Sequence, residues 1–128
     1  MDRITQNAFF HIGEDIAAKF LLNKGYELLC KNFRIRNGEI DIIMRSDTHL
    51  IFVEVKTRRF HSIDAALQTV TWTKRRNISR TAQEYINQNP DYAKLQTRFD
   101  IVLVFYEQAS NSFSVKHFPD AFYPVFDR

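Results

Sequence analysis

The sequence is poor in the residues that mark fibrous, flexible or cross-linked chains. Three glycines and three prolines among 128 residues exclude collagen-like, linker-like and low-complexity proteins. Cys30 is the only cysteine, which excludes an internal disulfide and a multi-cysteine zinc site. No apolar run approaches the roughly 20 residues that a membrane-spanning helix needs, and the first residues lack the basic-then-apolar layout of a secretion signal. We therefore expect a cytoplasmic protein with no membrane association.

The residues that are present favour a folded globular chain. Hydrophobic residues make up 45% of the sequence, at the usual globular level of about 45–50%. A chain of 128 residues fits one domain, since single cores commonly run to roughly 100–150 residues. We expect residues 1–128 to form a single domain.

The net charge of +3 conceals an uneven distribution of charge along the chain. Asp64 is the only acid between Lys56 and Arg80. The basic residues of this segment are Lys56, Arg58, Arg59, Lys74, Arg75, Arg76 and Arg80. Charge alone leaves two interpretations open, a surface that binds a polyanion and a solvated helix face.

Hydrophobic spacing predicts an α/β arrangement. Apolar residues four apart (Ile12, Ile16, Phe20) indicate a first helix over about residues 5–24, ended by Gly25. The same step predicts that residues 63–89 are mostly helical, up to the turn at Pro90. Strand-like runs occupy residues 26–35, 39–45, 50–56, 98–106 and 113–118. The expected order is helix, three strands, helix, strand, with a final short strand.

Two turns predict which residues of the three-strand segment face one another. Asn37-Gly38 is a strong hairpin signal, and the register we derive from it places Arg34 opposite Asp41. A hairpin closed at Asp47-Thr48 places Asp41 opposite Glu54, on one face of the ribbon. Lys56 shares that face, because strand side chains alternate. The other face is then apolar and carries Ile40, Ile42, Ile51, Val53 and Val55.

The two facing carboxylates need an explanation. Asp41 and Glu54 would repel unless a cation lay between them, and Glu54 and Lys56 are costly in an apolar strand if buried without partners. A divalent ion such as Mg²⁺ answers both problems, since it takes oxygen ligands. Lys56 would then activate water or stabilise charge on a phosphate. A Glu–Lys network on a half-exposed sheet is the alternative, and spacing alone gives the two equal weight.

The motifs then match a known family. Gly38-Glu39-Ile40-Asp41 and Phe52-Val53-Glu54-Val55-Lys56-Thr57-Arg58 are its most specific parts. With Gly13-Glu14, Lys74 and Arg98-Phe99-Asp100, they closely resemble the YraN-like family of small bacterial proteins. This family is placed by similarity in the restriction-endonuclease-like superfamily, near archaeal Holliday junction resolvases. The resemblance covers roughly residues 12–106 and implies an αβββαβ core, a mixed central sheet flanked by helices.

The resemblance also implies an activity and a set of site residues. A metal-dependent endonuclease would hydrolyse phosphodiester bonds in nucleic acid, here structured or branched DNA, with Mg²⁺ or Mn²⁺. Asp41, Glu54 and Glu14, with the carbonyl group of Val55, would hold one or two ions, and Lys56 would complete the catalytic set.

Other residues receive weaker assignments. Glu39 is interpreted as an acid that tunes the metal ligands or as a surface acid beside a turn. Arg34 either neutralises the site or contacts a phosphate. The remaining predicted nucleic-acid contacts are Arg58, Arg59, Lys74, Arg75, Arg76 and Arg80. Trp72 is expected in the core rather than against a base, Arg98 and Asp100 are expected to be structural, and His11, His49, His61 and His117 are expected on the surface.

Two further function classes remain open at this point. One is a non-catalytic nucleic-acid-binding module with a relic metal site. The other is a protein that binds a partner through its aromatic C-terminal tail. A homodimer would suit a two-fold DNA junction, although no motif in the sequence indicates one.

Overall fold

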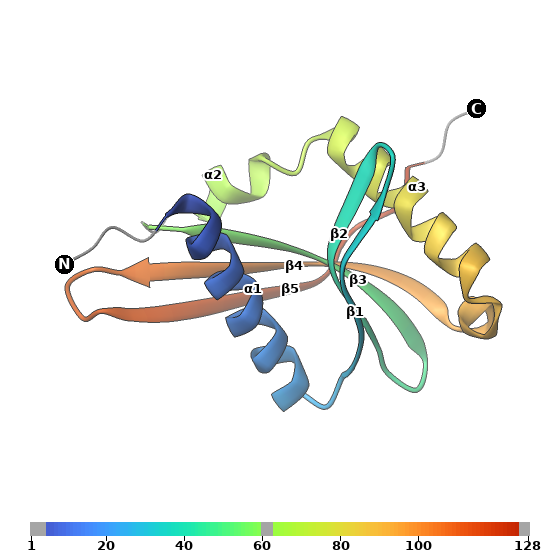
Figure 1. Cartoon of the computed structure of the whole chain (residues 1–128), viewed down its shortest axis with the longest axis horizontal. Helices are drawn as coiled ribbons and strands as arrows, with labels where there is room; N and C mark the ends of the chain where they lie inside the picture. Colours follow the sequence, from blue (N-terminus) through green and yellow to red (C-terminus); the bar gives the residue numbers. More distant parts are fainter. Residues whose placement is uncertain (1–4, 60–62, 126–128) are drawn as a thin grey trace.

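The computed structural model describes residues 5–59 and 63–125, and its centre is a five-stranded mixed sheet (Figure 1). The strands lie in the order β1-β2-β3-β4-β5; β3 and β4 are parallel, and the other neighbouring pairs are antiparallel. The elements are α1 (Gln6–Asn23), β1 (Glu27–Ile35), β2 (Gly38–Arg45), β3 (His49–Arg58), α2 (Ile63–Gln68), α3 (Trp72–Gln88), the 3-10 helix η1 (Pro90–Lys94), β4 (Gln96–Glu107) and β5 (Ser112–Phe122). This order confirms the predicted α/β class and is consistent with a restriction-endonuclease-like core.

The two long helices, α1 and α3, begin at side-chain caps. Thr5 caps α1 by accepting a hydrogen bond from the backbone N–H of Ala8 at 3.1 Å. The predicted second helix is divided into α2 and α3, because Thr71 caps a new helix by accepting from the N–H of Lys74 at 3.3 Å. Lys74 therefore lies in the first turn of α3. None of the described helices is long and apolar enough to cross a membrane.

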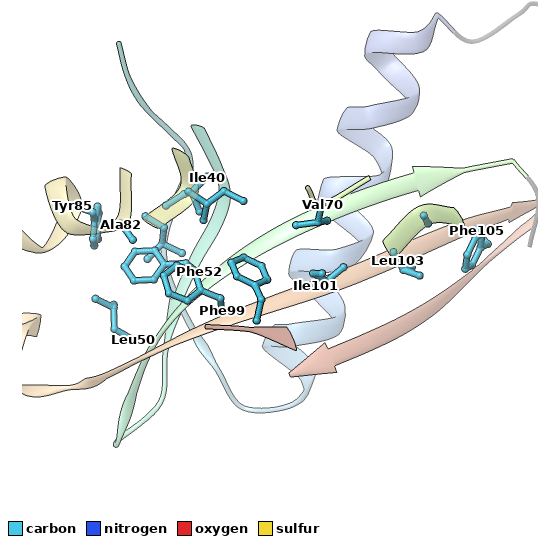
Figure 2. Packing of buried hydrophobic residues seen from close by; sticks show 14 residues of the cluster. Ile40, Leu50, Phe52, Val70, Ala82, Tyr85, Phe99, Ile101, Leu103 and Phe105 are labelled. Carbon is cyan, nitrogen blue, oxygen red and sulfur yellow. The ribbon is translucent and has the colours of Figure 1, made fainter. Parts of the chain in front are cut away.

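The sheet is covered by helices on both faces. Ala17 and Leu21 of α1 pack against one face, while Ile78 and Tyr85 of α3 pack against the other. Phe52 of β3 lies at the centre of this second layer (Figure 2). Because β3 is the middle strand and is covered on both sides, polar side chains near its C-terminal end are drawn into the interior.

The β2–β3 register is the predicted one. Ile42 lies opposite Val53, and Met44 lies opposite Ile51. The turn closes with a hydrogen bond from the N–H of Ser46 to the carbonyl group of His49 at 2.9 Å. The ladder of paired residues between β2 and β3 ends at Ile42–Val53, one residue before Asp41 and Glu54 would be paired.

The predicted β1–β2 register is wrong. Arg34 lies opposite Glu39 rather than Asp41. Gly38 is the first residue of β2 and not part of the turn, which falls at positions 36 and 37. A Cβ atom at Gly38 would overlap the hydroxyl group of Thr81, so this glycine lets α3 approach the strand closely.

Side-chain alternation in β2 breaks at Asp41. Ile42 packs on the α1 side, as predicted together with Ile51, Val53 and Val55. Ile40, two residues before Ile42, packs instead on the α3 side. Asn32, between the β1 residues paired with Ile40 and Ile42, has a left-handed backbone (φ 55°). Asp41 therefore lies at a local distortion of the sheet, a position typical of functional residues.

Candidate metal and nucleic-acid site

A pocket of about 350 Å³ opens where α1, the first three strands and the start of α3 meet. It contains all four residues predicted to be catalytic: Glu14, Asp41, Glu54 and Lys56. The other lining residues are Asn7, Phe10, His11, Asn32, Arg34, Glu39, Val55, Thr57, Arg58 and Lys74. Positions from 7 to 74 thus converge on one site.

Glu14 reaches the pocket because α1 crosses β3 at close range. Gly13 lies so near Thr57 that a Cβ atom there would overlap the threonine side chain. An ion pair of 2.6 Å between Asp15 and Lys31 ties the same turn of α1 to β1. Burial raises the pKa of Glu14, although a hydrogen bond from Asn32 opposes the rise. Its Oε2 atom is buried and has no hydrogen-bond partner among the described residues.

Asp41 is half-buried and lies near three other carboxylates, those of Glu54, Glu14 and Glu39. Its Oδ2 atom accepts a hydrogen bond from the backbone N–H of Val55 at 2.8 Å. The side chain thus satisfies a β3 donor just beyond the end of the β2–β3 ladder. Burial, followed by repulsion from Glu54, raises the pKa of Asp41 to about 8, with smaller contributions from Glu14 and Glu39.

Glu54 is paired with two ammonium groups from different elements. Its Oε1 atom lies 3.2 Å from Nζ of Lys56 on the same strand and 3.1 Å from Nζ of Lys74 on α3. Glu54 and Lys56 are each only 7% exposed, so the alternative of a Glu–Lys network on a half-exposed sheet is wrong. Burial lowers the pKa of Lys56. Burial also opposes the charge of Lys74, yet the attraction of Glu54 leaves the pKa of Lys74 raised.

The predicted nucleic-acid contacts fall into two groups. Arg34, Arg58 and Lys74 line the pocket. Nε of Arg34 lies 3.2 Å from Glu39, and Nη1 of Arg58 donates to the carbonyl group of Thr57 at 2.9 Å.

The other four basic residues do not line this pocket. Arg59 lies over the ring of Phe9 at 4.3 Å, and Nε of Arg75 donates to the carbonyl group of Val70 at 3.1 Å. Arg76 lies over Trp72 at 5.8 Å, and Arg80 is exposed farther along α3. Trp72 is 57% exposed, so its predicted place in the core is wrong.

The donor set suits a hard divalent cation. Carboxylate oxygens and a carbonyl oxygen are the ligands that Mg²⁺ takes, and the unpartnered Oε2 of Glu14 is a donor atom without a bond in the described part of the chain. Burial makes the largest contribution to the raised pKa of Asp41 and repulsion from Glu54 the next, and a bound cation would relieve that repulsion. Over residues 5–59 and 63–125, however, no three His, Cys, Asp or Glu side chains gather into a ready ligand group. A cation would draw the carboxylates closer together.

Several lining residues were not expected from the sequence. Asn32 carries one usable signal, because asparagine tolerates the left-handed backbone that interrupts a strand. His11 is exposed, as predicted, and also lines the pocket. Phe10 and Asn7 also line the pocket. The apolar spacing used to predict α1 did not show that their face of the helix borders a site.

A second polar cluster lies outside the pocket, around Asp100. Its fully buried carboxylate accepts from Nε and Nη2 of Arg98, both at 2.9 Å, and from the N–H of Asp120 at 2.9 Å. Nε2 of His117 lies 2.7 Å away. This supports the structural roles expected for Arg98 and Asp100. The His117 side chain is 3% exposed, so its predicted surface position is wrong, and His61 lies outside the described residues.

Comparison with known proteins identifies the family. The sequence model described as "Uncharacterised protein family UPF0102" matches residues 13–104, which include the predicted catalytic residues. A UPF0102 protein of Clostridium botulinum (strain Loch Maree / Type A3) is 38% identical over 110 residues, 86% of this chain and 89% of the relative. A UPF0102 protein of Caldicellulosiruptor bescii is 38% identical over 86% of this chain and 92% of its own, and one of Clostridium novyi is 39% identical over 86% and 91%. The chain therefore belongs to the UPF0102 family, the YraN-like family that its motifs resemble.

Proposed function

We propose that this protein is a metal-dependent endonuclease that hydrolyses phosphodiester bonds in nucleic acid, with structured or branched DNA as its substrate. One observation carries the proposal: Asp41, Glu54 and Lys56 lie in one pocket whose rim is basic. The two acids supply oxygen ligands for a metal ion of the kind that assists phosphodiester hydrolysis, and the lysine supplies a positive charge beside them.

Each residue has a chemical role in this proposal. Asp41, Glu54 and Glu14, with the carbonyl group of Val55, would hold one or two Mg²⁺ or Mn²⁺ ions. A bound ion would supply Lewis-acid polarisation of the phosphate and a lowered pKa for water. Lys56 orients the attacking water, or stabilises the negative charge that develops on the phosphate oxygens. Water adds to phosphorus, the P–O bond to the leaving oxygen breaks, and that oxygen ends with a proton.

The basic rim would hold the nucleic-acid backbone. Arg34, Arg58 and Lys74 line the pocket beside the acids, and such contacts set affinity and register without reading sequence. Glu39 offsets Arg34 through their 3.2 Å ion pair. A homodimer would present two such pockets to a two-fold junction, and sedimentation with and without junction DNA tests this.

A non-catalytic nucleic-acid-binding module is the second candidate, and one observation favours it. Glu54 is already neutralised by Lys56 and Lys74, and no ready three-ligand group is found in the described part of the chain. A relic site would hold its carboxylate in this way.

A cleavage panel separates the two candidates. Single-stranded, duplex, flap and four-way-junction DNA are incubated with the protein in Mg²⁺, in Mn²⁺ and in a chelator. We expect metal-dependent cleavage that Asp41→Asn abolishes and that Asp91→Asn, an exposed acid on η1, leaves intact. Unchanged cleavage by Asp41→Asn would sink the proposal, while salt-dependent binding without cleavage of any substrate would favour the second candidate.

A further inference from the structure

One face of α1 forms a wall of the pocket. Asn7, Phe10, His11 and Glu14 all line it, and their spacing of three, four and seven residues places them on one helix face. Glu14 brings a partly buried carboxylate, and Phe10, one turn earlier, brings a ring that is 37% exposed. The wall thus combines a carboxylate with an aromatic ring one helical turn away.

Phe10 differs from the other phenylalanines of α1. Phe9 is 6% exposed and contacts the rings of Tyr106 and Phe113. Phe20 packs edge-on against His117. Within the described residues, no ring contact is recorded for Phe10. A single exposed aromatic residue is ordinary on a protein surface, so its position on the pocket wall is what gives Phe10 significance.

The basic residues of the pocket suit the phosphate of a nucleotide, and the ring of Phe10 suits its base. Arg34, Arg58 and Lys74 supply cationic groups suited to phosphate. An exposed ring suits the flat face of a base, since base–aromatic stacking is sequence-tolerant. One pocket therefore offers surfaces for both parts of a nucleotide.

The size of the pocket restricts what can enter. Its volume of about 350 Å³ lies at the low end of small-ligand sites, roughly 300–1,000 Å³. Inside a continuous duplex both faces of each base are covered by its neighbours. A base can meet Phe10 face to face only after it leaves the stack, which costs least where the strand is already unpaired.

We propose that Phe10 stacks on an unpaired base beside the phosphate held by the rim, so that the substrate class is DNA with a locally single-stranded segment. This inference rests on the proposed function, because it uses the same pocket. It assigns to α1 a contact that selects strand structure, separate from the acids that serve hydrolysis.

The test compares binding by Phe10 variants with binding by a matched control. Phe10→Leu keeps an apolar side chain but removes the ring face, Phe10→Trp keeps a ring, and Leu22→Ala changes a 44% exposed residue of α1 that does not line the pocket. Dissociation constants are measured in Ca²⁺ by fluorescence anisotropy, with single-stranded DNA and with duplex DNA of the same sequence. A 2-aminopurine base in the single strand reports stacking through quenching of its fluorescence.

We expect Phe10→Leu to weaken single-strand binding about 5- to 100-fold, to abolish the quenching and to leave duplex binding unchanged. Phe10→Trp and Leu22→Ala should behave like the wild type. Equal affinities for Phe10→Leu and wild type, or equal losses on single strand and duplex, overturn the inference, and circular dichroism verifies that the variant is folded.

Cleavage is scored separately on the same proteins. Metal-dependent cleavage with no effect of Phe10 on binding would remove this inference and leave the proposed function standing. Phe10-dependent quenching with no cleavage of any substrate would support the inference and remove the proposed nuclease activity. Absence of binding to every DNA would overturn both.

Discussion

Nζ of Lys74 lies 3.1 Å from Oε1 of Glu54, so a helix residue contacts an acid of the central strand inside the pocket. Lys56 contacts the same oxygen at 3.2 Å. Two ammonium groups therefore occupy the region in which a metal ion would compete for Glu54. Lys74 therefore lines the pocket, whereas the α3 arginines Arg75, Arg76 and Arg80 do not.

Removal of Lys74 should strengthen metal binding. We expect Lys74→Ala to bind Mg²⁺ several-fold more tightly than the wild type, because one of the two cations competing for Glu54 is gone. DNA binding should weaken, since a rim charge is lost. Isothermal titration with Mg²⁺ measures the first effect, and Arg80→Ala, on the same helix but outside the pocket, is the control. Weaker Mg²⁺ binding by Lys74→Ala would contradict the competition.

The raised pKa of Asp41 predicts a pH dependence of stability. The pKa is about 8 in the folded, metal-free protein and about 4 in the unfolded chain. Between these values the folded state holds more protons, so the free energy of unfolding should fall as pH rises from about 4 to about 8. In the Asp41→Asn variant the free energy of unfolding should not show this fall. Urea denaturation across this range measures it, and identical pH profiles for the two proteins would refute it.

Mg²⁺ should change the stability of the protein over the same pH range. Mg²⁺ competes with the proton on Asp41, so its stabilising effect on the wild type should grow with pH.

Lys56 should affect the rate of cleavage more than the binding of DNA. It is 7% exposed and lies beside Glu54, and in the proposed function it acts on the attacking water or on the phosphate charge. We expect Lys56→Ala to lower kcat about 10²- to 10⁴-fold with little change in the dissociation constant for DNA. Lys94→Ala, an exposed lysine on η1, should match the wild type. A Lys56→Ala variant that retained kcat would exclude this role.

The contact between Gly13 and Thr57 should be required for α1 to dock. A Cβ atom at Gly13 would overlap the Thr57 side chain, so Gly13→Ala should destabilise the fold by about 1–3 kcal/mol and displace Glu14 from the pocket. The double variant Gly13→Ala/Thr57→Ala should recover stability, because the added methyl group takes the space left by the threonine. Chemical denaturation of both single variants and the double variant gives the coupling energy, and additive effects would show that the two residues are independent.

Asp100 should stabilise the protein at neutral pH and lose this effect in acid. Burial alone would raise the pKa of its carboxyl group, but hydrogen bonds from His117, Arg98 and the N–H of Asp120 hold that pKa below its ordinary value. Its contribution is therefore present above the unfolded pKa of about 4 and is lost as pH falls through the folded pKa. Asp100→Asn should lose about 3 kcal/mol at neutral pH and show a weaker acid-induced loss of stability. Asp91→Asn should change neither quantity.

The local parts of the fold were predictable from sequence. The two-residue turn at Asp47-Thr48 determined the β2–β3 register, because a tight turn leaves only one pairing between its flanking strands. The four-residue spacing of apolar side chains predicted α1. The acid-x-Lys triplet pointed to the centre of the candidate site. Each of these features depends on residues close in sequence.

The parts that depend on distant contacts were not predictable. Gly38 resembled a turn glycine, but it accommodates Thr81 from α3. The pocket position of Lys74 follows from the break between α2 and α3, which a continuous periodic pattern concealed. Similarly, the break in alternation at Asp41 depends on the backbone of Asn32 on another strand. In each case the deciding partner lies elsewhere in the chain.

The hydrogen bond from Val55 to Asp41 determines when the site becomes ordered. A free aspartate side chain loses rotational freedom when it binds a cation, and this loss weakens binding. Asp41 is already restrained by a 2.8 Å bond to the middle strand, and Glu54 by two lysines. Much of the entropy of restraining these carboxylates is therefore lost during folding, so a cation that drew them together would not have to order freely rotating side chains.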